Sequence, residues 1–254
     1  SAASDVYKRQ YLTVVTDSFV INKSWLCSKS PLWAVTDPWT RAIMEEKGLP
    51  QDRLRVTGFP VNPVLGALAK EHPLSWKEGE PFRVLYFAQR SARHARAELA
   101  GMLDANPALH VTCILGRRFR RIYPRIRDLR ARYGRRLTVR GWTRRVPSYL
   151  AASHVVVGKA GGATVHEVLA AARPMLVNFL LPGQEEGNTR LLEKLGGGGH
   201  VPDVRALASA LQEMMADGGA QWRRMHENLL RAGMTGGSGR IADLALKLAE
   251  EHTN

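Results

Sequence analysis

From Phe82 onward, short apolar segments alternate with amphipathic ones, and this alternation limits the chain to a small group of folds. The apolar segments are expected to form strands over Phe82–Ala88, His110–Leu115, Leu137–Arg140, Val155–Val157 and Met175–Phe179. Helices are expected near Arg93–Ala105, Pro124–Tyr133, Val146–Ala151, Thr164–Ala172, Thr189–Leu195, Val204–Ala216, Ala220–Ala232 and Ser238–His252. Continuous apolar strands separated by helices predict an α/β fold: a doubly wound parallel sheet of the Rossmann type, with helices on both faces.

The first 81 residues repeat this alternation less completely. Strands are expected over Tyr11–Thr16 and Leu54–Thr57, with a helix over Thr40–Lys47 between them. We therefore divide the chain into the end of an N-terminal domain (11–65), a linker (66–81) that is rich in Pro, Gly, Lys and Glu, a C-terminal domain (82–234) and a C-terminal helix (235–254). The letters DVYKRQ at residues 5–10 resemble a translated sequencing adapter, so residues 1–10 are left out of the fold prediction and the chain is expected to be an N-terminally truncated fragment.

Composition narrows the classes of function. No apolar run approaches the roughly 20 residues of a membrane-spanning helix. Cys27 and Cys113 are the only cysteines, which excludes a disulfide framework and a cysteine zinc site and suits a reducing cytoplasm. The formal net charge is +14, and the segment from Arg117 to Arg145 holds 13 arginines against one acid, Asp128. This charge predicts an anionic partner: nucleic acid, a phosphorylated substrate or an acidic membrane surface.

The first candidate site is the turn from Lys159 to Glu167, between a predicted strand and a predicted helix. Gly161 and Gly162 permit close backbone approach, and a helix N-terminus there would stabilise a phosphate or a sugar oxygen. Glu167 could accept hydrogen bonds from the hydroxyls of a ribose. An alternative remains open, because Thr164 and Glu167 also have the spacing of a capping box that serves only the helix itself.

The second candidate site is the turn from Leu181 to Asn188, which again follows a strand and precedes a helix. Gln184, Glu185 and Asn188 offer amide and carboxylate groups that suit several hydroxyls of a sugar. The same composition is typical of a solvated loop. However, two such turns at successive strand ends would open on the same side of a parallel sheet.

These residues resemble a known family in order along the chain. The features are a V-x-G-aromatic strand end (Val139, Gly141, Trp142), the K-A-G-G-x-T-x-x-E turn and the G-Q-E-x-G-N loop. Together they resemble the C-terminal domain of monogalactosyldiacylglycerol synthase and, more distantly, the transferase that adds N-acetylglucosamine to the lipid-linked peptidoglycan precursor. Upstream, Val14–Asp17 with Trp25, and Thr57–Val61, look like the end of that family's N-terminal domain.

The resemblance implies a two-Rossmann glycosyltransferase of the GT-B type, which moves a hexose from a UDP-sugar to a lipid such as diacylglycerol. It implies inversion at the anomeric carbon, no metal (the chain has no D-x-D triplet), no cofactor beyond the donor, and a peripheral position on the cytoplasmic face of a membrane. The implied roles of the residues are uracil binding at the backbone of Gly141 and Trp142, ribose binding at Glu167, diphosphate binding at Gly161, Gly162 and Thr164, and hexose binding at Gln184, Glu185 and Asn188.

Three departures from the family pattern affect these expectations. The glycine-rich loop after the first strand of the C-terminal domain is replaced by Ala88–His94, where Arg90 and Arg93 could bind phosphate as side chains instead. Asn22 stands where the plant synthases carry a histidine. The family's glycine-rich turn with its catalytic histidine is expected upstream of this chain, so the general base is not assigned and the fragment is expected to be inactive alone.

Two other functions stay open at this stage. A catalytically inactive sugar-nucleotide-binding relative would explain Asn22 and the missing glycine loop. A basic nucleic-acid-binding α/β protein would explain the charge, although no recognition motif is present. His94, His154, His166 and His200 are scattered, and we interpret them as surface or core residues.

Overall fold

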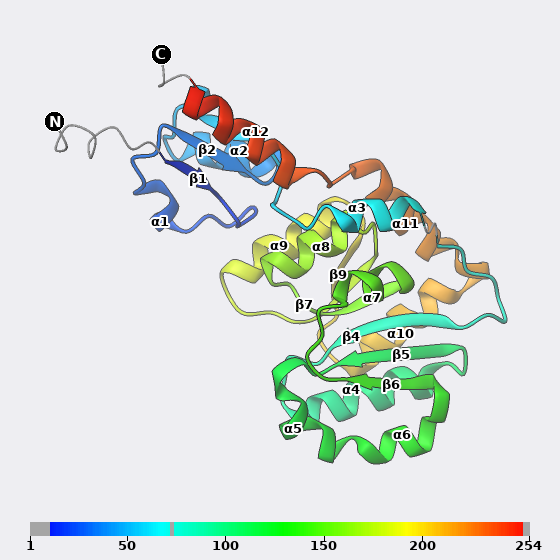
Figure 1. The fold of residues 1–254 in the computed structure, drawn as a ribbon. Coiled ribbons are helices and arrows are strands. Elements are labelled where there is room, and N and C mark those ends of the chain that lie inside the picture. Colours follow the sequence, from blue (N-terminus) through cyan, green and yellow to red (C-terminus); the bar gives the residue numbers. More distant parts are fainter. Residues whose placement is uncertain (1–10, 72–73, 251–254) are drawn as a thin grey trace.

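The structure is a computed structural model that describes residues 11–71 and 74–250, so the adapter-like residues 1–10 lie outside its described part. Figure 1 shows two parts, a small N-terminal sheet and a larger C-terminal sheet, each with its own helices. The last helix returns from the larger part to the smaller one. The described residues contain no helix that is both long enough and apolar enough to span a membrane.

The larger part is built on a parallel sheet of six strands in the order β6-β5-β4-β7-β8-β9. The strands are β4 (Phe82–Phe87), β5 (Leu109–Ile114), β6 (Leu137–Arg140), β7 (Val155–Lys159), β8 (Met175–Phe179) and β9 (Gly198–His200). This is the Rossmann order, and the direction of winding reverses between β4 and β7. The predicted doubly wound parallel sheet is therefore confirmed, and ligands of such sheets bind outside the carboxyl ends of the strands at that reversal.

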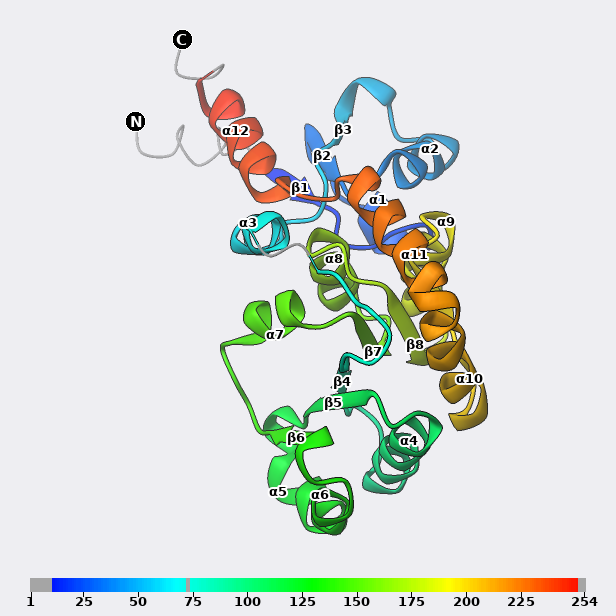
Figure 2. The same cartoon turned by 90° about the vertical axis from the view of Figure 1, so that its right-hand side faces the viewer.

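Helices cover both faces of this sheet because successive strand residues are buried in opposite directions. Val84 and Tyr86 pack into one core with α4 and α10, whereas Leu85 packs into another with α8. Figure 2 shows α4 and α10 on one side of the strands and α3 and α7 on the other. The helices are α4 (Ala92–Ala105), α5 (Phe119–Ile122), α6 (Arg127–Tyr133), α7 (Val146–Ala152), α8 (Gly162–Ala170), α9 (Gln184–Lys194), α10 (Val204–Met215) and α11 (Ala220–Ala232). Short 3₁₀ turns are η3 (Gly116–Arg118), η4 (Tyr123–Arg125), η5 (Gly134–Arg136) and η6 (Asp217–Gly219).

The smaller part is a parallel sheet in the order β1-β2-β3. Its elements are β1 (Leu12–Val14), α1 (Lys23–Leu26), β2 (Leu32–Val35), α2 (Pro38–Glu46), η2 (Gln51–Arg53) and β3 (Leu54–Val56). Asp37 caps α2, because its carboxylate accepts hydrogen bonds from the backbone of Thr40 at 2.8 Å and from the hydroxyls of Thr36 and Thr40 at 2.7 Å. The loops after β1 and β2 thus carry buried polar side chains, and Ser18 in the first of these loops contacts His166 of the larger part.

Some predicted boundaries need correction. The expected linker over 66–81 begins later, because α3 (Val64–Glu71) continues through its first residues and packs on α7 and α8. β2, β9 and α1 were not predicted. β9 consists of Gly198, Gly199 and His200, which lack the apolar pattern of a strand and are ordered by their pairing with β8.

The C-terminal helix α12 (Gly237–Glu250) packs on the N-terminal part rather than extending the larger one. Its Ser238 hydroxyl donates to the carbonyl of Val61 at 2.6 Å, and Arg240 donates to the carbonyl of Thr57 at 2.6 Å. The segment Thr57–Val61 is therefore held between α12 and the helices of the larger sheet.

Candidate functional site

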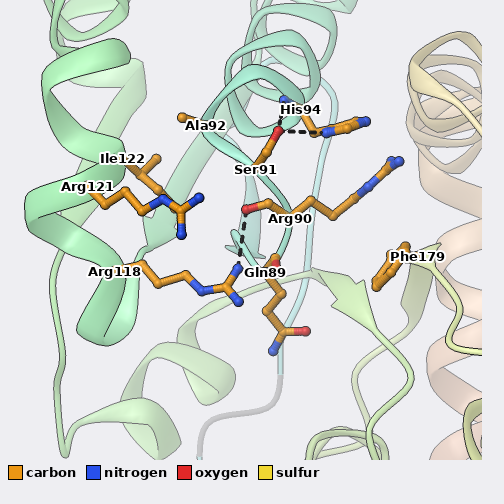
Figure 3. Close-up of a pocket in the computed structure, with 9 residues that line it drawn as sticks. All are labelled: Gln89, Arg90, Ser91, Ala92, His94, Arg118, Arg121, Ile122 and Phe179. Atoms are coloured by element: carbon orange, nitrogen blue, oxygen red, sulfur yellow. Dashed lines mark hydrogen bonds between the residues drawn. The ribbon is translucent and has the colours of Figure 1, made fainter.

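The carboxyl edge of the larger sheet carries two cavities that meet. The first, of about 450 Å³, lies between the loop after β4 and the segment that contains η3 and α5. We call it the arginine pocket, and Figure 3 shows its lining. The residues that line it are Gln89, Arg90, Ser91, Ala92, His94, Arg118, Arg121, Ile122 and Phe179.

The second cavity, of about 520 Å³, lies over the ends of β4, β5, β7 and β8, and we call it the strand-end pocket. Its lining includes the apolar side chains Phe87, Ile114 and Leu115 together with Lys159. Gln89, Arg118 and Phe179 line both cavities, so the two form adjoining lobes of one cleft. This cleft lies where the Rossmann order predicts a ligand, at the reversal between β4 and β7.

Arg90 is held in place at the wall of the arginine pocket. Its guanidinium donates to Glu98 Oε1 at 3.3 Å and lies 5.3 Å from the centre of the Phe179 ring. The other oxygen of Glu98 accepts from the amide of Asn178 at 2.9 Å and from the hydroxyl of Tyr86. Burial and the neighbouring Glu98 raise the pKa of Tyr86 well above its ordinary value, so this hydroxyl keeps its proton and donates.

The loop after β4 has no glycine, as the sequence indicates, and an arginine stabilises its conformation. The guanidinium of Arg118 in η3 donates to the backbone carbonyls of Gln89 at 2.5 Å and Arg90 at 3.4 Å. Ser91 caps α4 and shares a hydrogen bond of 2.8 Å with His94 Nδ1. The loop therefore presents side-chain cations where the resembling family presents backbone N–H groups.

At the turn after β7, the capping-box interpretation is wrong. The N-cap of α8 is Gly161, and no side chain caps this helix. Thr164 and Glu167 lie on the same face of α8 as the exposed Ala163, while Val165 and Val168 are buried on the opposite face. In the described residues the Glu167 carboxylate has no hydrogen-bond or ion-pair partner, and partial burial raises its pKa.

The same turn is also a contact with the N-terminal part. A Cβ at Gly162 would lie 3.0 Å from the carbonyl oxygen of Thr16. His166 Nε2 lies 3.2 Å from the hydroxyl of Ser18, and its ring stacks on Phe59 with 4.4 Å between ring centres. Burial lowers the pKa of His166 to about 4, so the imidazole is neutral in the folded chain at neutral pH.

The turn after β8 contacts the turn after β7 directly. Lys159 Nζ lies 2.5 Å from Glu185 Oε1, and Glu185 Oε2 accepts from the backbone of Leu181 at 2.9 Å. Asn188 Nδ2 donates to the carbonyl of Ala160 at 3.0 Å, whereas its buried Oδ1 has no partner among the described residues. The Gln184 side chain lies outside the described part of the structure.

The strand end after β6 lies beside the strand-end pocket. The carbonyl of Arg140 accepts from the backbone of Leu115 at 2.9 Å, which brings Gly141 next to a residue of the pocket lining. A Cβ at Gly141 would lie 3.5 Å from the Phe119 ring. Trp142 is 59% exposed, and the Arg144 guanidinium lies 5.6 Å from its ring centre.

The other singled-out residues have structural positions. His154 is buried, accepts from the backbone of Arg83 at 2.8 Å, and has its pKa lowered to about 3, chiefly by burial. Asn22 caps α1 by accepting from the backbone of Ser24 at 2.9 Å. His200 is exposed on β9. Within residues 11–71 and 74–250, no group of three or more His, Cys, Asp or Glu side chains is arranged to hold a metal ion.

The sequence motifs do not point to Glu98, and they do not distinguish Arg118 and Arg121 from the rest of the arginine run. Glu98 is 3% exposed and stands in the buried stripe of α4 with Ala95 and Met102. A carboxylate at a core position of a predicted helix is an anomaly that could have marked it. Arg118 and Arg121 belong to a run of arginines that look alike in the sequence, because only the fold determines which of them line the cavity.

Comparison with known proteins agrees with this geometry. The structure superposes on MurG of Acinetobacter baumannii with a TM-score of 0.68 and 14% identity, covering 97% of this chain and 69% of that one. It also superposes on the UDP-N-acetylglucosamine 2-epimerase of Neisseria meningitidis, with a TM-score of 0.69 and 13% identity over 97% of this chain and 72% of that one. The fold is GT-B. Since an epimerase shares it, the fold alone does not distinguish transfer from epimerisation.

Sequence relatives are more discriminating, although no family model matches the chain. It is 24% identical over 210 residues to a processive diacylglycerol β-glucosyltransferase of Staphylococcus carnosus, covering 81% of this chain and 53% of that protein. It is 25% identical to a probable monogalactosyldiacylglycerol synthase of Oryza sativa, covering 96% of this chain and 50% of that one. A transferase of Nitrobacter winogradskyi that acts on pyrophosphoryl-undecaprenol N-acetylmuramyl-pentapeptide is 26% identical, with 82% and 59% covered.

These relatives confirm the resemblance that the three motifs predict. The chain spans about half the length of the first curated relatives it matches.

Proposed function

We propose that this chain forms the donor-binding half of a glycosyltransferase that moves a hexose from a UDP-sugar to a lipid acceptor such as diacylglycerol. The observation that carries the proposal is the half-buried carboxylate of Glu167, which has no partner among the described residues and lies in the first two turns of α8, the helix that follows β7 of the Rossmann sheet. The acceptor class is taken from the sequence relatives, which include transferases named for diacylglycerol and for undecaprenol-linked acceptors. The donor class is taken from solved structures of similar fold, which include complexes with UDP and with UDP-glucose.

In this proposal the loop after each strand binds a different part of the donor. The backbone at Gly141 and Trp142 borders the uracil, and Glu167 accepts hydrogen bonds from the ribose hydroxyls. The turn at Gly161, Gly162 and Thr164 lies beside the nucleotide.

The turn after β8 faces the hexose in this proposal, through Gln184 and Asn188. Glu185 acts through its ion pair with Lys159, because both of its oxygens already have partners. The free Oδ1 of Asn188 is an acceptor for a sugar hydroxyl or a water that bridges to one.

Chemistry in this arrangement is a single displacement with inversion at the anomeric carbon. A base removes the proton of the acceptor hydroxyl, the oxygen forms a bond to the anomeric carbon, and the bond to the diphosphate breaks. The diphosphate leaves with the electron pair, and fixed cations in the cleft stabilise its negative charge. No residue of this chain is assigned as the base.

The test of donor binding uses calorimetry on the chain as it stands. Wild type is expected to bind UDP, and Glu167→Ala is expected to weaken that binding about tenfold or more, since a charged hydrogen-bond partner is removed. Glu186→Ala is the matched control, because Glu186 is an exposed carboxylate on α9 and should leave the affinity unchanged. Absence of UDP binding by wild type would reject the proposal, and an unchanged affinity in Glu167→Ala would reject the ribose role.

We also propose that the protein lies on the anionic cytoplasmic face of a membrane through the exposed arginines of α5, η4 and α6. Two acids near this surface are already paired, Asp128 with Arg96 at 2.6 Å and Asp104 with Arg132 at 3.1 Å. Arg120, Arg127 and Arg130 thus keep their charge for an outside partner, at about 1 kcal/mol each near an anionic surface.

Cosedimentation with vesicles tests this surface. Binding to phosphatidylglycerol vesicles is expected to exceed binding to phosphatidylcholine vesicles and to fall with added salt. Equal binding to both lipids would contradict the proposal. Salt-sensitive binding to single-stranded RNA without binding to vesicles would favour a nucleic-acid partner instead.

A further inference from the structure

The opposite edge of the larger sheet, where the strands begin, carries a third cavity of about 310 Å³. Arg83, His110 and Thr138 line it, and they are the second residues of β4, β5 and β6. We call it the amino-edge pocket. The cleft formed by the arginine pocket and the strand-end pocket lies at the carboxyl ends of the strands, so the amino-edge pocket is a separate place on the molecule.

Polar side chains gather on one face of the sheet at this edge. Arg83 pairs with His110 between β4 and β5, and Thr112 pairs with Thr138 between β5 and β6. Residues two apart on a strand share a face, so His110 and Thr112 point the same way as Ile114, which is buried in the core that contains α8. Strands of a parallel sheet that is covered on both faces are normally apolar at such positions. This group of polar residues therefore breaks the apolar pattern of its own strands.

The charge of the amino-edge pocket is positive. Arg83, Arg135 and Arg136 bring three guanidinium groups to its lining, and no acidic side chain of the described residues lines it. Burial lowers the pKa of His110, and the charges of Arg136 and Arg83 lower it further. Positive charges that lie close together without a counter-charge repel one another, and an anion between them removes the repulsion. The pocket therefore suits an anionic ligand.

Two of these arginines have N–H groups without an acceptor. Arg83 is held by its Nε, which donates to the carbonyl of Ala152 at 2.6 Å, and by its Nη2, which lies 3.2 Å from His154 Nε2. Its Nη1 has no hydrogen bond within residues 11–71 and 74–250. Arg136 donates through Nη2 to the carbonyl of Leu103, whereas its buried Nε has no partner in the described part of the structure. A polar hydrogen without an acceptor costs stability, so an anion that accepts from these groups would stabilise the folded chain.

We propose that the amino-edge pocket binds a phosphate group. The guanidinium groups of Arg83, Arg135 and Arg136 neutralise its charge. The hydroxyls of the half-buried Thr112 and Thr138 donate to its oxygens. Donors that come from β4, β5, β6 and η5 surround the cavity from several directions, which matches the tetrahedral oxygens of phosphate better than the planar oxygens of a carboxylate. This site is independent of the proposed function.

Calorimetry with inorganic phosphate tests the site, in the presence of UDP so that the ion does not bind in the cleft. Wild type is expected to bind phosphate. Arg135→Ala removes an exposed guanidinium from the lining and is expected to weaken this binding about fivefold to tenfold, and Thr138→Val about threefold. Arg224→Ala is the matched control, because it removes the same charge from an exposed position on α11. No binding by wild type, or the same affinity in all three variants, would overturn the proposal.

The His110 imidazole provides a second readout, within the pocket itself. A bound phosphate offsets the charges of Arg83 and Arg136, so it is expected to raise the pKa of His110. Proton NMR of the histidine ring signals over a pH series, with and without phosphate, measures this change, and the exposed His200 is the control. A pKa of His110 that stays the same when phosphate saturates the chain would place the ion elsewhere and overturn the proposal. This readout does not require UDP to bind, so it remains decisive if the proposed function fails.

The phosphate group has two possible sources, the free ion and the headgroup of a phosphorylated lipid. Cosedimentation with phosphatidylcholine vesicles that contain phosphatidic acid separates them. Thr138→Val leaves the charge of the protein unchanged, so a loss of vesicle binding in this variant comes from the pocket and not from the surface arginines of α6. Such a loss supports a headgroup in the pocket. Weaker phosphate binding by Thr138→Val with unchanged vesicle binding supports the free ion.

Discussion

The loop after β4 and the segment after β8 each follow a strand of the same sheet, but their residues have different surroundings. The loop after β4 lacks glycine, borders an open cavity and places Arg90 in its wall. The segment after β8 leads into α9, where a Cβ at Gly187 would overlap the carbonyl oxygen of Ser18 in the N-terminal part. Gly187 thus allows two backbones to approach, whereas Arg90 borders a cavity with its side chain.

Adding a methyl group at Gly187 tests this difference most strongly. Gly187→Ala is expected to lower the free energy of unfolding by about 3 kcal/mol, because the Cβ would press on backbone atoms of Ser18 and Val20 that have little room to move. Urea denaturation followed by circular dichroism measures the change.

A second glycine gives the control. Gly239 lies in α12, is exposed, and would carry a Cβ with no other atom within 4 Å. Gly239→Ala is expected to stabilise the chain by roughly 0.5–1 kcal/mol through helix propensity. If both variants change stability equally, Gly187 has no special packing role and the comparison fails.

Much of the fold could be predicted from the sequence, because periodicity reports burial. β6, β8 and α11 match their expected ranges, and the expected strand over Phe82–Ala88 corresponds to β4. β9 could not be predicted, since its glycine residues are ordered by a neighbouring strand rather than by their own pattern. Such strands form through contacts with distant parts of the chain, and the local sequence does not show these contacts.

The candidate site was less predictable than the fold. The sequence motifs identified Glu167 and the two glycine turns as candidates. They did not show that Gly162 and His166 contact the N-terminal part. They singled out Arg90 and Arg93, of which only Arg90 lines the cavity, and they did not separate Arg121 from the other arginines of the chain. That difference depends on which guanidinium group faces which cavity, and this follows only from tertiary structure.

Acidification probes His166, which links α8 to the N-terminal part through Ser18. Its pKa of about 4 in the folded chain lies below the value of about 6.5 expected when unfolded, so between these pH values only the unfolded chain takes up the proton. Stability is therefore present above about pH 6.5 and is lost as the pH falls toward 4. From about pH 7.5 to about pH 5 this residue is expected to account for about 2 kcal/mol of lost stability.

The measurement compares wild type with His166→Gln at both pH values. The glutamine amide has no proton to gain, so the variant should lose about 2 kcal/mol less than wild type over this interval. His200→Gln is the control, because His200 is exposed and should leave the pH dependence as it is. Identical pH profiles for wild type and His166→Gln would contradict a buried, neutral His166.

The smallest expected effect concerns Thr164. Because no side chain caps α8, Thr164→Ala is expected to change the free energy of unfolding by less than about 0.5 kcal/mol. Asp203→Ala provides the reference, since Asp203 caps α10 by accepting from Ala206 at 2.9 Å and its loss should cost about 1 kcal/mol. Equal losses in the two variants would restore the capping box at α8.

The most direct measurement is a crystal structure of this chain with UDP. We expect the uracil ring beside Gly141 and Trp142 and the ribose hydroxyls about 2.7–3.2 Å from the carboxylate oxygens of Glu167. UDP bound with its ribose hydroxyls beyond hydrogen-bond reach of Glu167 would contradict this expectation.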